Sequence, residues 1–252
     1  MRHFIDLAYC GAQYHGWQTQ PDAVTVQSVL EDALGRLVRQ PVAITGAGRT
    51  DAGVNASRMI AHVDLPDDFE VSGRVLHSLN FMIGRDIAVY SFTPVHDSAH
   101  ARFDAVERTY HYYANTVKSA FTHPLSWLAP PRLDFEAMNR AGQLIVGRRD
   151  FSSFAKSHTD VKTHICDLRR VAWEDLGGGN HRLVVVADRF LRNMVRAITG
   201  TLVDVGRGKL TPADVLAIVD KQDRGAAGTS MPAHALFLAD IRYDYYSPPP
   251  RL

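Results

Sequence analysis

The sequence is poor in cysteine. Only Cys10 and Cys166 occur among 252 residues, far apart and in no CxxC arrangement. Two such cysteines form neither a disulfide framework nor a thiolate zinc site. The twelve histidines show no metal-ligand clustering, and no HExxH pattern occurs. We therefore expect a protein of a reducing compartment that binds no metal.

Long hydrophobic runs are also missing. The longest aliphatic run, LVVVA from Leu183 to Ala187, has the length of a buried strand and is too short to span a membrane. The N-terminal MRHFIDLAYC alternates polar and apolar residues and lacks the apolar core of a signal peptide. Low complexity is confined to SPPPRL, residues 247–252, which we expect to be an extended, flexible tail. These absences favour a cytoplasmic protein without a membrane-bound part.

Lysine is scarce: the chain has 5 Lys against 23 Arg, while its formal net charge is only +1. A guanidinium group binds phosphate through two parallel hydrogen bonds and stacks on bases, whereas an ammonium group is a hydrated point charge. Between Arg182 and Lys209, six basic residues stand against two acids. Two interpretations stay open, an arginine-rich solvated surface or a basic cleft for nucleic acid.

Apolar periodicity predicts helices and strands in two halves of similar order. Helices are expected over 26–38, 71–79, 135–146 and 190–203 and from Thr211-Pro212, and strands near 4–9, 59–64, 86–93, 108–115, 163–173, 182–187 and 235–241. This order predicts an α+β fold of two similar halves, each a mainly antiparallel sheet with helices on one face (a duplicated split β-α-β arrangement), with the active-site cleft between them. We assign residues 1–104 to the N-terminal half, 105–246 to the C-terminal half and 247–252 to the tail.

Small residues crowd the stretch ITGAGRTDAGVNA, residues 44–56, as in loops that bind phosphate. Both common phosphate patterns are nevertheless absent, because Asp51 occupies the position of the third glycine of GxGxxG and no Gly-Lys-Ser/Thr follows. In an extended stretch, Arg49 and Asp51 would share one face, with Thr50 on the other. The guanidinium would keep the carboxylate ionised even where water is excluded. An ionised, oriented carboxylate is a nucleophile or a general base.

The two glycines that flank this acid, Gly48 and Gly53, would let the backbone turn sharply and let a bulky substrate approach. A second interpretation is an Asp that caps a turn and pairs with a neighbouring Arg, without catalysis. Short motifs occur by chance, so the residues of this stretch leave both interpretations open.

The stretch AGRTDAGVNA resembles the catalytic loop of the tRNA pseudouridine synthase A family, whose pattern is AGRTDAGVH followed by a small residue. Other blocks resemble that family in family order: YHGWQ (14–18), TVQSVLEDAL (25–34), NFMIGRDIAV (80–89), HARFDAVERTYHYY (100–113), FLRNMVRAITGTL (190–202) and PAHALFL (232–238). Together these blocks cover nearly the whole chain.

The resemblance implies an isomerase that converts uridine to pseudouridine in the anticodon stem-loop of tRNA, at positions 38–40, without a metal or organic cofactor. It makes Asp51 the nucleophile or base that cleaves and re-forms the glycosidic linkage, supported by Arg49 and Arg196. Tyr110 would pack against the target base and accept its surplus proton, and Leu191 would form an apolar wall. The implied partners are tRNA, through its anticodon arm, and a second copy of the chain in a homodimer.

The sequence departs from the family pattern at a few positions. Asn55 stands where the family has His, on the expected rim of the loop, and Arg192-Asn193 replaces the commoner Arg-His. Tyr112 and Tyr113 are predicted to be core tyrosines, and Trp17 a packing residue at a turn. No role in catalysis is assigned to these positions.

Two other functions stay open at this point. A hydrolase could use Asp51 to cleave a nucleoside and let water complete the reaction, which releases the base. An RNA-binding module would carry out no chemistry at all.

Overall fold

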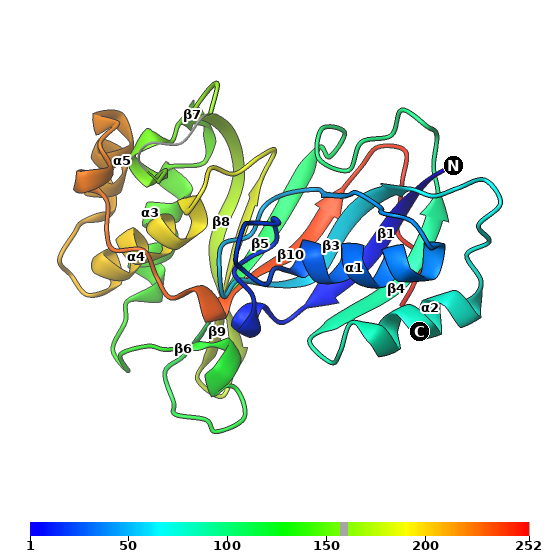
Figure 1. Ribbon diagram of the computed structural model, residues 1–252. Coiled ribbons are helices and arrows are strands. Elements are labelled where there is room, and N and C mark those ends of the chain that lie inside the picture. Colours follow the sequence, from blue (N-terminus) through cyan, green and yellow to red (C-terminus); the bar gives the residue numbers. More distant parts are fainter. Residues whose placement is uncertain (157–160, 252) are drawn as a thin grey trace. The chain divides into compact units, whose positions relative to one another are not determined.

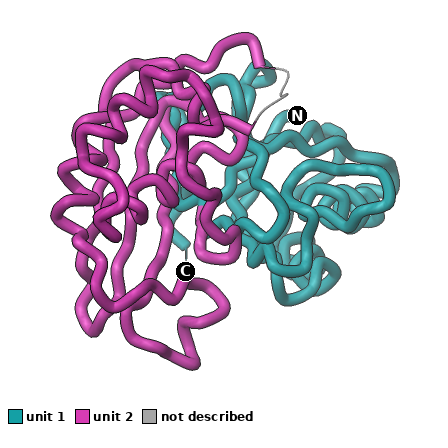
Figure 2. The backbone as a smooth tube through the Cα atoms, turned by 90° about the vertical axis from the view of Figure 1, so that its left-hand side faces the viewer, with its two compact units in different colours: residues 1–106, 238–252 teal, residues 107–237 magenta. Residues whose placement is uncertain are grey.

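The computed structural model describes residues 1–156 and 161–251. The chain forms two compact units, which Figure 2 shows in different colours: residues 1–106 with 238–252 are unit 1, and residues 107–237 are unit 2. The fold is mixed α+β, and the strand pairs are mostly antiparallel. Within the described ranges, no helix has both the length and the apolar character needed to cross a membrane.

Unit 1 consists of strands with two helices. Its elements are β1 (Arg2–Tyr9), η1 (Gly11–Gln13), α1 (Val26–Val38), β2 (Ile44–Gly46), β3 (Asn55–Asp64), α2 (Gly73–Met82), β4 (Ile87–Pro94) and β10 (Leu236–Arg242). The strands lie in the order β4-β1-β3-β10, and β2 also pairs with β3. Figure 1 shows α1 and α2 on one face of these strands.

The helix predicted over 26–38 is confirmed as α1, and the local sequence explains both of its ends. The Thr25 side chain accepts a hydrogen bond from the Ser28 backbone N–H, and the Ser28 hydroxyl accepts one from the Thr25 N–H, which is a capping box. At the other end, Arg39 adopts the left-handed conformation, with φ of 64°. Val26, Leu30 and Leu34 are buried, so the predicted apolar stripe is the face that packs.

The C-terminal segment differs from the flexible tail predicted for 247–252. Arg251 donates two hydrogen bonds to the buried Asp6 carboxylate, at 3.1 and 2.5 Å, and its guanidinium lies 4.0 Å from the centre of the Tyr90 ring. Tyr246 packs edge-on against Phe4 at 5.0 Å. Leu252 lies outside the described residues. Side-chain contacts thus anchor a segment whose backbone has no regular structure.

The predicted division of the chain also differs from the two units. Residues 238–246, predicted in the C-terminal half, belong to unit 1. The reason is long-range, because β10 is a neighbour of β3 and Tyr243 donates a 2.6 Å hydrogen bond to the Ala101 carbonyl.

Unit 2 has helices on one side of its strands (Figure 1). Its elements are β5 (Glu107–Asn115), η2 (His123–Leu125), β6 (Trp127–Leu128), α3 (Phe135–Leu144), β7 (Gly147–Asp150), η3 (Ser152–Phe154), β8 (Ile165–Gly177), β9 (Asn180–Ala187), α4 (Met194–Gly206), α5 (Pro212–Lys221), η4 (Arg224–Ala226) and η5 (Ala233–Ala235). The strands lie in the order β5-β9-β8-β7, and β6 pairs in parallel with β5.

Two helices of unit 2 begin where the sequence predicts, at residue 135 and after Thr211. The Asp134 side chain accepts from the Ala137 N–H at 2.8 Å and starts α3, and Thr211 forms a capping box with Asp214 at the start of α5. The helix predicted from residue 190 begins later, at Met194. Asn193 adopts a left-handed conformation, with φ of 68°, which is incompatible with a helix that passes through it.

Candidate active site

The stretch around Asp51 is the loop between β2 and β3, residues 47–54. The segment that follows β1 holds this loop through its backbone. The Trp17 N–H donates to the Thr50 carbonyl at 3.2 Å, and the Gly53 N–H donates to the Tyr14 carbonyl at 3.3 Å. The loop is therefore fixed against a second segment of unit 1.

Thr50 points into the protein and its two neighbours do not. Its side chain is 7% exposed, and its hydroxyl lies 2.8 Å from the hydroxyl of Tyr9, the last residue of β1. Arg49 is exposed and Asp51 is half-buried. This alternation agrees with the extended backbone predicted for the loop. The ion pair between Arg49 and Asp51 stays a prediction.

Of the two glycines predicted to let the loop turn sharply, only Gly53 has a backbone conformation that favours glycine. Gly53 has φ of +77°, a conformation that favours glycine, as expected for a sharp turn. Gly48 has no such constraint, and a Cβ atom there would meet nothing within 4 Å. At Gly46, in contrast, a Cβ atom would lie 2.6 Å from the Trp17 indole. Glycine at 46 therefore makes room for the buried tryptophan, which is a packing residue as predicted.

Asn55 lies in the interior, and the prediction that it lies on the rim of the loop is wrong. Its side chain is 1% exposed, and its Oδ1 accepts a hydrogen bond from the Gly11 N–H at 2.8 Å. Gly11 approaches the Val54 carbonyl so closely that a Cβ atom would collide with it. Asn55 thus supplies the acceptor for a backbone N–H that this close packing encloses.

Unit 2 brings two other predicted site residues close in one region. Tyr110 lies on β5 opposite Val185 and is 9% exposed. Its ring packs edge-on against Phe190, with centroids 5.0 Å apart. Leu191 follows directly and is buried in the turn before α4, where its carbonyl accepts from the Met194 N–H. Tyr110 therefore has an aromatic neighbour in the turn that leads to α4.

Arg196 lies in the first turn of α4 and is half-buried. Its Nε donates to the Met231 carbonyl at 2.6 Å, and its own carbonyl accepts from the Met231 N–H at 3.1 Å. Its charge acts on the Tyr112 phenol, where it opposes the rise in pKa that burial produces. Arg196 is thus held near the β5 tyrosines and is more than an ordinary surface arginine.

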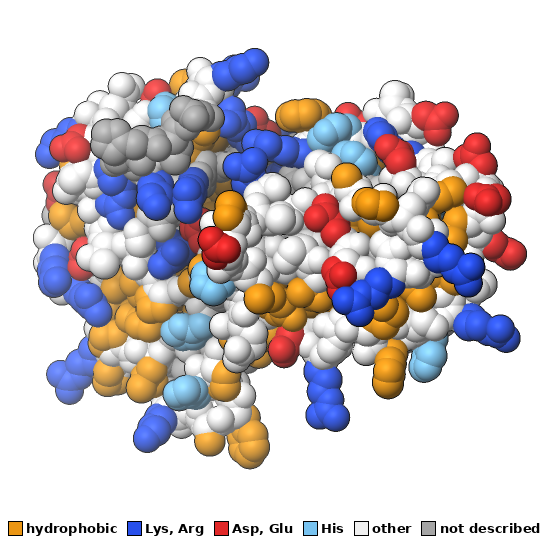
Figure 3. Space-filling model, viewed as in Figure 1, with side chains coloured by type: hydrophobic (Ala, Val, Ile, Leu, Met, Phe, Trp, Pro, Cys, Tyr) orange, Lys and Arg blue, Asp and Glu red, His pale blue; other side chains and the backbone are white. Residues whose placement is uncertain are grey.

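The basic run from 182 to 209 does not form one uniform patch. Arg182 pairs with Glu174 at 2.6 Å, and Arg207 and Lys209 lie 3.9 and 3.4 Å from Asp204. Arg192 is exposed in the turn before α4. On the face drawn in Figure 3, Lys and Arg side chains gather over the region of α3 and α4. Half of the run thus lies beside acidic side chains, although Arg207 and Lys209 share the single carboxylate of Asp204.

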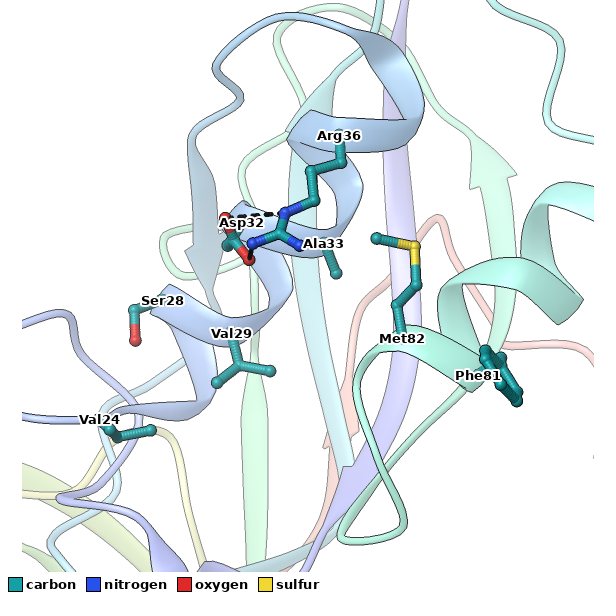
Figure 4. A pocket seen from close by; sticks show the side chains of 8 residues that line it. All are labelled: Val24, Ser28, Val29, Asp32, Ala33, Arg36, Phe81 and Met82. Atoms are coloured by element: carbon teal, nitrogen blue, oxygen red, sulfur yellow. Dashed lines mark hydrogen bonds and ion pairs between the residues drawn. The ribbon is translucent and has the colours of Figure 1, made fainter.

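The structure also contains a shallow groove of about 500 Å³ between α1 and α2 (Figure 4). Val29, Phe81 and Met82 supply apolar lining, and Arg36 pairs with Asp32 at 2.8 Å along one side. None of the predicted site residues lines this groove. Across residues 1–156 and 161–251, no group of three or more His, Cys, Asp and Glu side chains could hold a metal ion.

The predicted site residues fall into two sets. Asp51 and Arg49 belong to unit 1, and Tyr110, Leu191 and Arg196 belong to unit 2. The sequence does not reveal that Tyr9 and Thr50 hold the Asp51 loop. Their hydroxyl groups meet across a long sequence separation, and such a contact produces no local sequence pattern. Tyr112 is fully buried, as predicted for a core tyrosine, and the alternation in TYHYY puts it on the face of Tyr110.

Comparison with known proteins shows which family the chain resembles. Residues 141–244 match the family model described as tRNA pseudouridine synthase. The chain is 51% identical over 244 residues to tRNA pseudouridine synthase A of Porphyromonas gingivalis, covering 96% of this chain and 97% of that protein. It is 50% identical to the Parabacteroides distasonis protein of the same name, covering 96% of each, and 34% identical to that of Bacillus subtilis, covering 97% and 100%. With identity this high over nearly its whole length, the chain belongs to the tRNA pseudouridine synthase A family.

Proposed function

We propose that this protein isomerises uridine to pseudouridine in the anticodon stem-loop of tRNA, with the Asp51 carboxylate as nucleophile or base. The observation that carries the proposal is the identity of about half of all residues with tRNA pseudouridine synthase A proteins, over 96% of the chain. The enzyme is accordingly a tRNA pseudouridine synthase, an isomerase. The restriction to positions 38–40 comes from the family resemblance.

The reaction needs one group that acts at the glycosidic linkage. The bond from ribose C1′ to uracil N1 breaks, the base turns, and a bond from C1′ to C5 forms, after which C5 loses its proton and N1 gains one. The half-buried position of Asp51 suits a carboxylate that meets an extruded uridine. The Asp51 carboxylate starts the reaction either by attack on the sugar or by removal of a ribose proton. No cofactor is required, because atoms and electrons balance within the nucleotide.

The other site residues assist this step. We assign Arg49 and Arg196 to the support of the Asp51 carboxylate and of the pocket. Tyr110 packs against the target base and accepts the proton from C5, and Leu191 forms an apolar wall. Extruding a base from its stack costs a few kcal/mol of free energy. Stacking of the extruded base on an aromatic side chain offsets roughly 1–3 kcal/mol of that cost. The edge-on packing of Tyr110 on Phe190 supports such a role, because it fixes the orientation of the ring.

The remaining family expectations are part of the same proposal. We propose that the two units are duplicated split β-α-β arrangements with an active-site cleft between them, that the enzyme is a homodimer and that it is cytoplasmic. The mixture of antiparallel strands and helices in each unit supports the duplication. Sedimentation of the purified protein tests the homodimer.

The function is tested on unmodified tRNA transcript. Pseudouridine is mapped by position after incubation with the wild-type protein, with Asp51→Asn, and with the control Asp68→Asn, which changes an exposed carboxylate. We expect pseudouridine at 38–40 with the wild type and the control, and a loss of at least about a thousandfold with Asp51→Asn, since such losses follow removal of a nucleophile. Binding of tRNA by Asp51→Asn should persist.

The same assay separates the rival functions. A hydrolase would release free uracil and leave abasic sites in the RNA. A non-catalytic RNA-binding module would form no pseudouridine and would be unaffected by Asp51→Asn. Either result would refute the proposed function.

A further inference from the structure

Residues 227–231 lie against α4 without a helix or strand of their own. The Gly228 N–H donates to the Thr201 hydroxyl at 2.8 Å, and a Cβ atom at Gly200 would collide with the Thr229 carbonyl. Glycine at 200 therefore lets the segment approach the backbone of the helix. The roles assigned so far do not involve this segment, although its contacts with α4 define its path closely.

The last residue of the segment holds the arginine that is assigned to the pocket. The Met231 N–H donates to the Arg196 carbonyl at 3.1 Å, and the Met231 carbonyl accepts from the Arg196 Nε at 2.6 Å. Met231 thus binds both the backbone and the side chain of Arg196. Because Nε belongs to the planar, rigid guanidinium, this bond restricts where the rest of the group points. A shift of the Met231 carbonyl would therefore turn the guanidinium.

Ser230, directly before Met231, receives two hydrogen bonds through one hydroxyl oxygen. Asn193 Nδ2 donates to it at 2.6 Å and Arg224 Nη2 at 3.0 Å. Asn193 is the residue before α4, and its side chain does not cap the helix. Arg224 belongs to η4 and also donates to two carbonyls of the segment, at 3.3 and 3.2 Å. The Ser230 hydroxyl thus joins the start of α4 to η4 and fixes the segment one residue before Met231.

We propose that Ser230 is a positioning residue for Arg196, because its hydroxyl fixes the Met231 carbonyl to which the guanidinium is bound. Without the hydroxyl, Asn193 and Arg224 lose their shared acceptor, and the end of the segment is free to shift. Small displacements of a group in an active site cost much of the rate. The inference rests on the proposed function, in which Arg196 supports catalysis, and it assigns Ser230 no contact with the substrate.

A double-mutant cycle tests this role. Turnover of tRNA transcript and melting temperature are measured for the wild type, Ser230→Ala, Arg196→Gln and the double variant, at a temperature at which circular dichroism shows all four folded. We expect Ser230→Ala to lower kcat about tenfold, since a misplacement of about 1 Å costs about a hundredfold and the remaining bonds of the segment limit the shift. KM for tRNA should be nearly unchanged. In the Arg196→Gln background, Ser230→Ala should have no further effect on kcat.

Two further variants serve as comparisons. Ser230→Thr keeps the hydroxyl and should retain the kcat of the wild type. Thr229→Ala is the matched control, because it removes the hydroxyl of the exposed neighbouring residue and should also leave kcat unchanged.

Wild-type kcat in Ser230→Ala would overturn the inference. An equal loss of kcat with and without Arg196, or an equal loss in Ser230→Thr, would assign Ser230 a structural role instead and also overturn it. A rise in KM without a fall in kcat would do the same, because the effect would then lie in tRNA binding. Failure of the proposed function is distinct, because the wild type itself would then form no pseudouridine.

Discussion

The hydroxyl groups of Tyr9 and Thr50 lie 2.8 Å apart and join the last residue of β1 to the residue before Asp51. Both side chains are buried, so neither hydroxyl has free access to water. The bond therefore sets the position of Thr50 and, through the backbone, the direction in which the next side chain leaves the loop. Catalytic groups need such support, since small displacements of a reacting group cost much of the rate.

Tyr9→Phe should consequently affect turnover more than the fold. Removal of the phenol hydroxyl takes away one contact of the buried Thr50 hydroxyl, which costs about 1–3 kcal/mol of stability. We expect a kcat reduced by about ten- to a hundredfold, because a 1 Å misplacement has an effect of that order. Thermal unfolding and turnover of tRNA transcript measure the two effects. Tyr90→Phe is the control, and a Tyr9→Phe enzyme with unchanged kcat would show that the loop needs no such tether.

Asn55→Ala should destabilise unit 1. The substitution leaves the Gly11 N–H without its acceptor in a buried place, which costs about 1–3 kcal/mol. Urea unfolding measures the change. Gln13→Ala removes an exposed amide from the same turn and should change stability by less than about 0.5 kcal/mol. Equal effects of the two substitutions would contradict a stabilising role for the hydrogen bond from Gly11 to Asn55.

Arg251 should contribute strongly to stability in spite of its place near the C-terminus. Its loss leaves the fully buried Asp6 carboxylate with Arg58 alone, whose Nε is 3.6 Å away. Breaking one partner of a buried pair costs on the order of 3 kcal/mol. We expect Arg251→Gln to lower the free energy of unfolding by that amount.

Two further variants check the interpretation of Arg251. Asp6→Asn combined with Arg251→Gln should recover part of the loss, since the unpaired charge is then gone. Arg36→Gln, which breaks the exposed pair with Asp32, should cost no more than about 0.5 kcal/mol. Additive effects of Asp6→Asn and Arg251→Gln would exclude a direct pair.

His62 should make stability depend on pH. Its buried Nδ1 accepts from the Ala101 N–H at 3.1 Å, and burial, aided by the charge of Arg2, lowers its pKa to about 4. The unfolded imidazole has a pKa of about 6.5 and takes up a proton first as pH falls. The free energy of unfolding should therefore decrease between about pH 6.5 and 4 and lose no more through this group below that range.

His62→Gln provides the comparison, because its amide oxygen can accept the same hydrogen bond but does not titrate. Urea unfolding at pH values from 8 to 4 should show a smaller decline for this variant than for the wild type. Parallel curves would mean that His62 contributes nothing to the pH dependence.

The sequence predicts well where the signal is local. The apolar stripe of residues 26–38 predicts α1, and the helix starts predicted at residue 135 and at Thr211-Pro212 are confirmed as α3 and α5. Strand β7 was not predicted, because GRRD has no alternation of apolar residues and forms a strand only through its pairing with β8. The late start of α4 depends on one backbone angle at Asn193, which an apolar stripe does not reveal.

The candidate site could likewise be predicted where the signal is local, and could not where it depends on contacts between distant residues. The stretch around Asp51 identifies itself by its residues, and Thr50 faces inward as the two-residue period requires. The depth of Asn55 could not be predicted, since it depends on how Gly11, forty-four residues earlier, packs against the loop. The anchoring of Arg251 likewise needs Asp6, at the opposite end of the chain.

The contact between Trp17 and Gly46 has an optical consequence. The indole of Trp17 is buried. The backbone N–H of Trp17 donates to the Thr50 carbonyl, which couples this residue to the loop. Any rearrangement of the Asp51 loop alters the polarity around this ring and with it the wavelength of its emission. The protein thus carries an intrinsic fluorescent reporter whose backbone is hydrogen-bonded to the residue before Asp51.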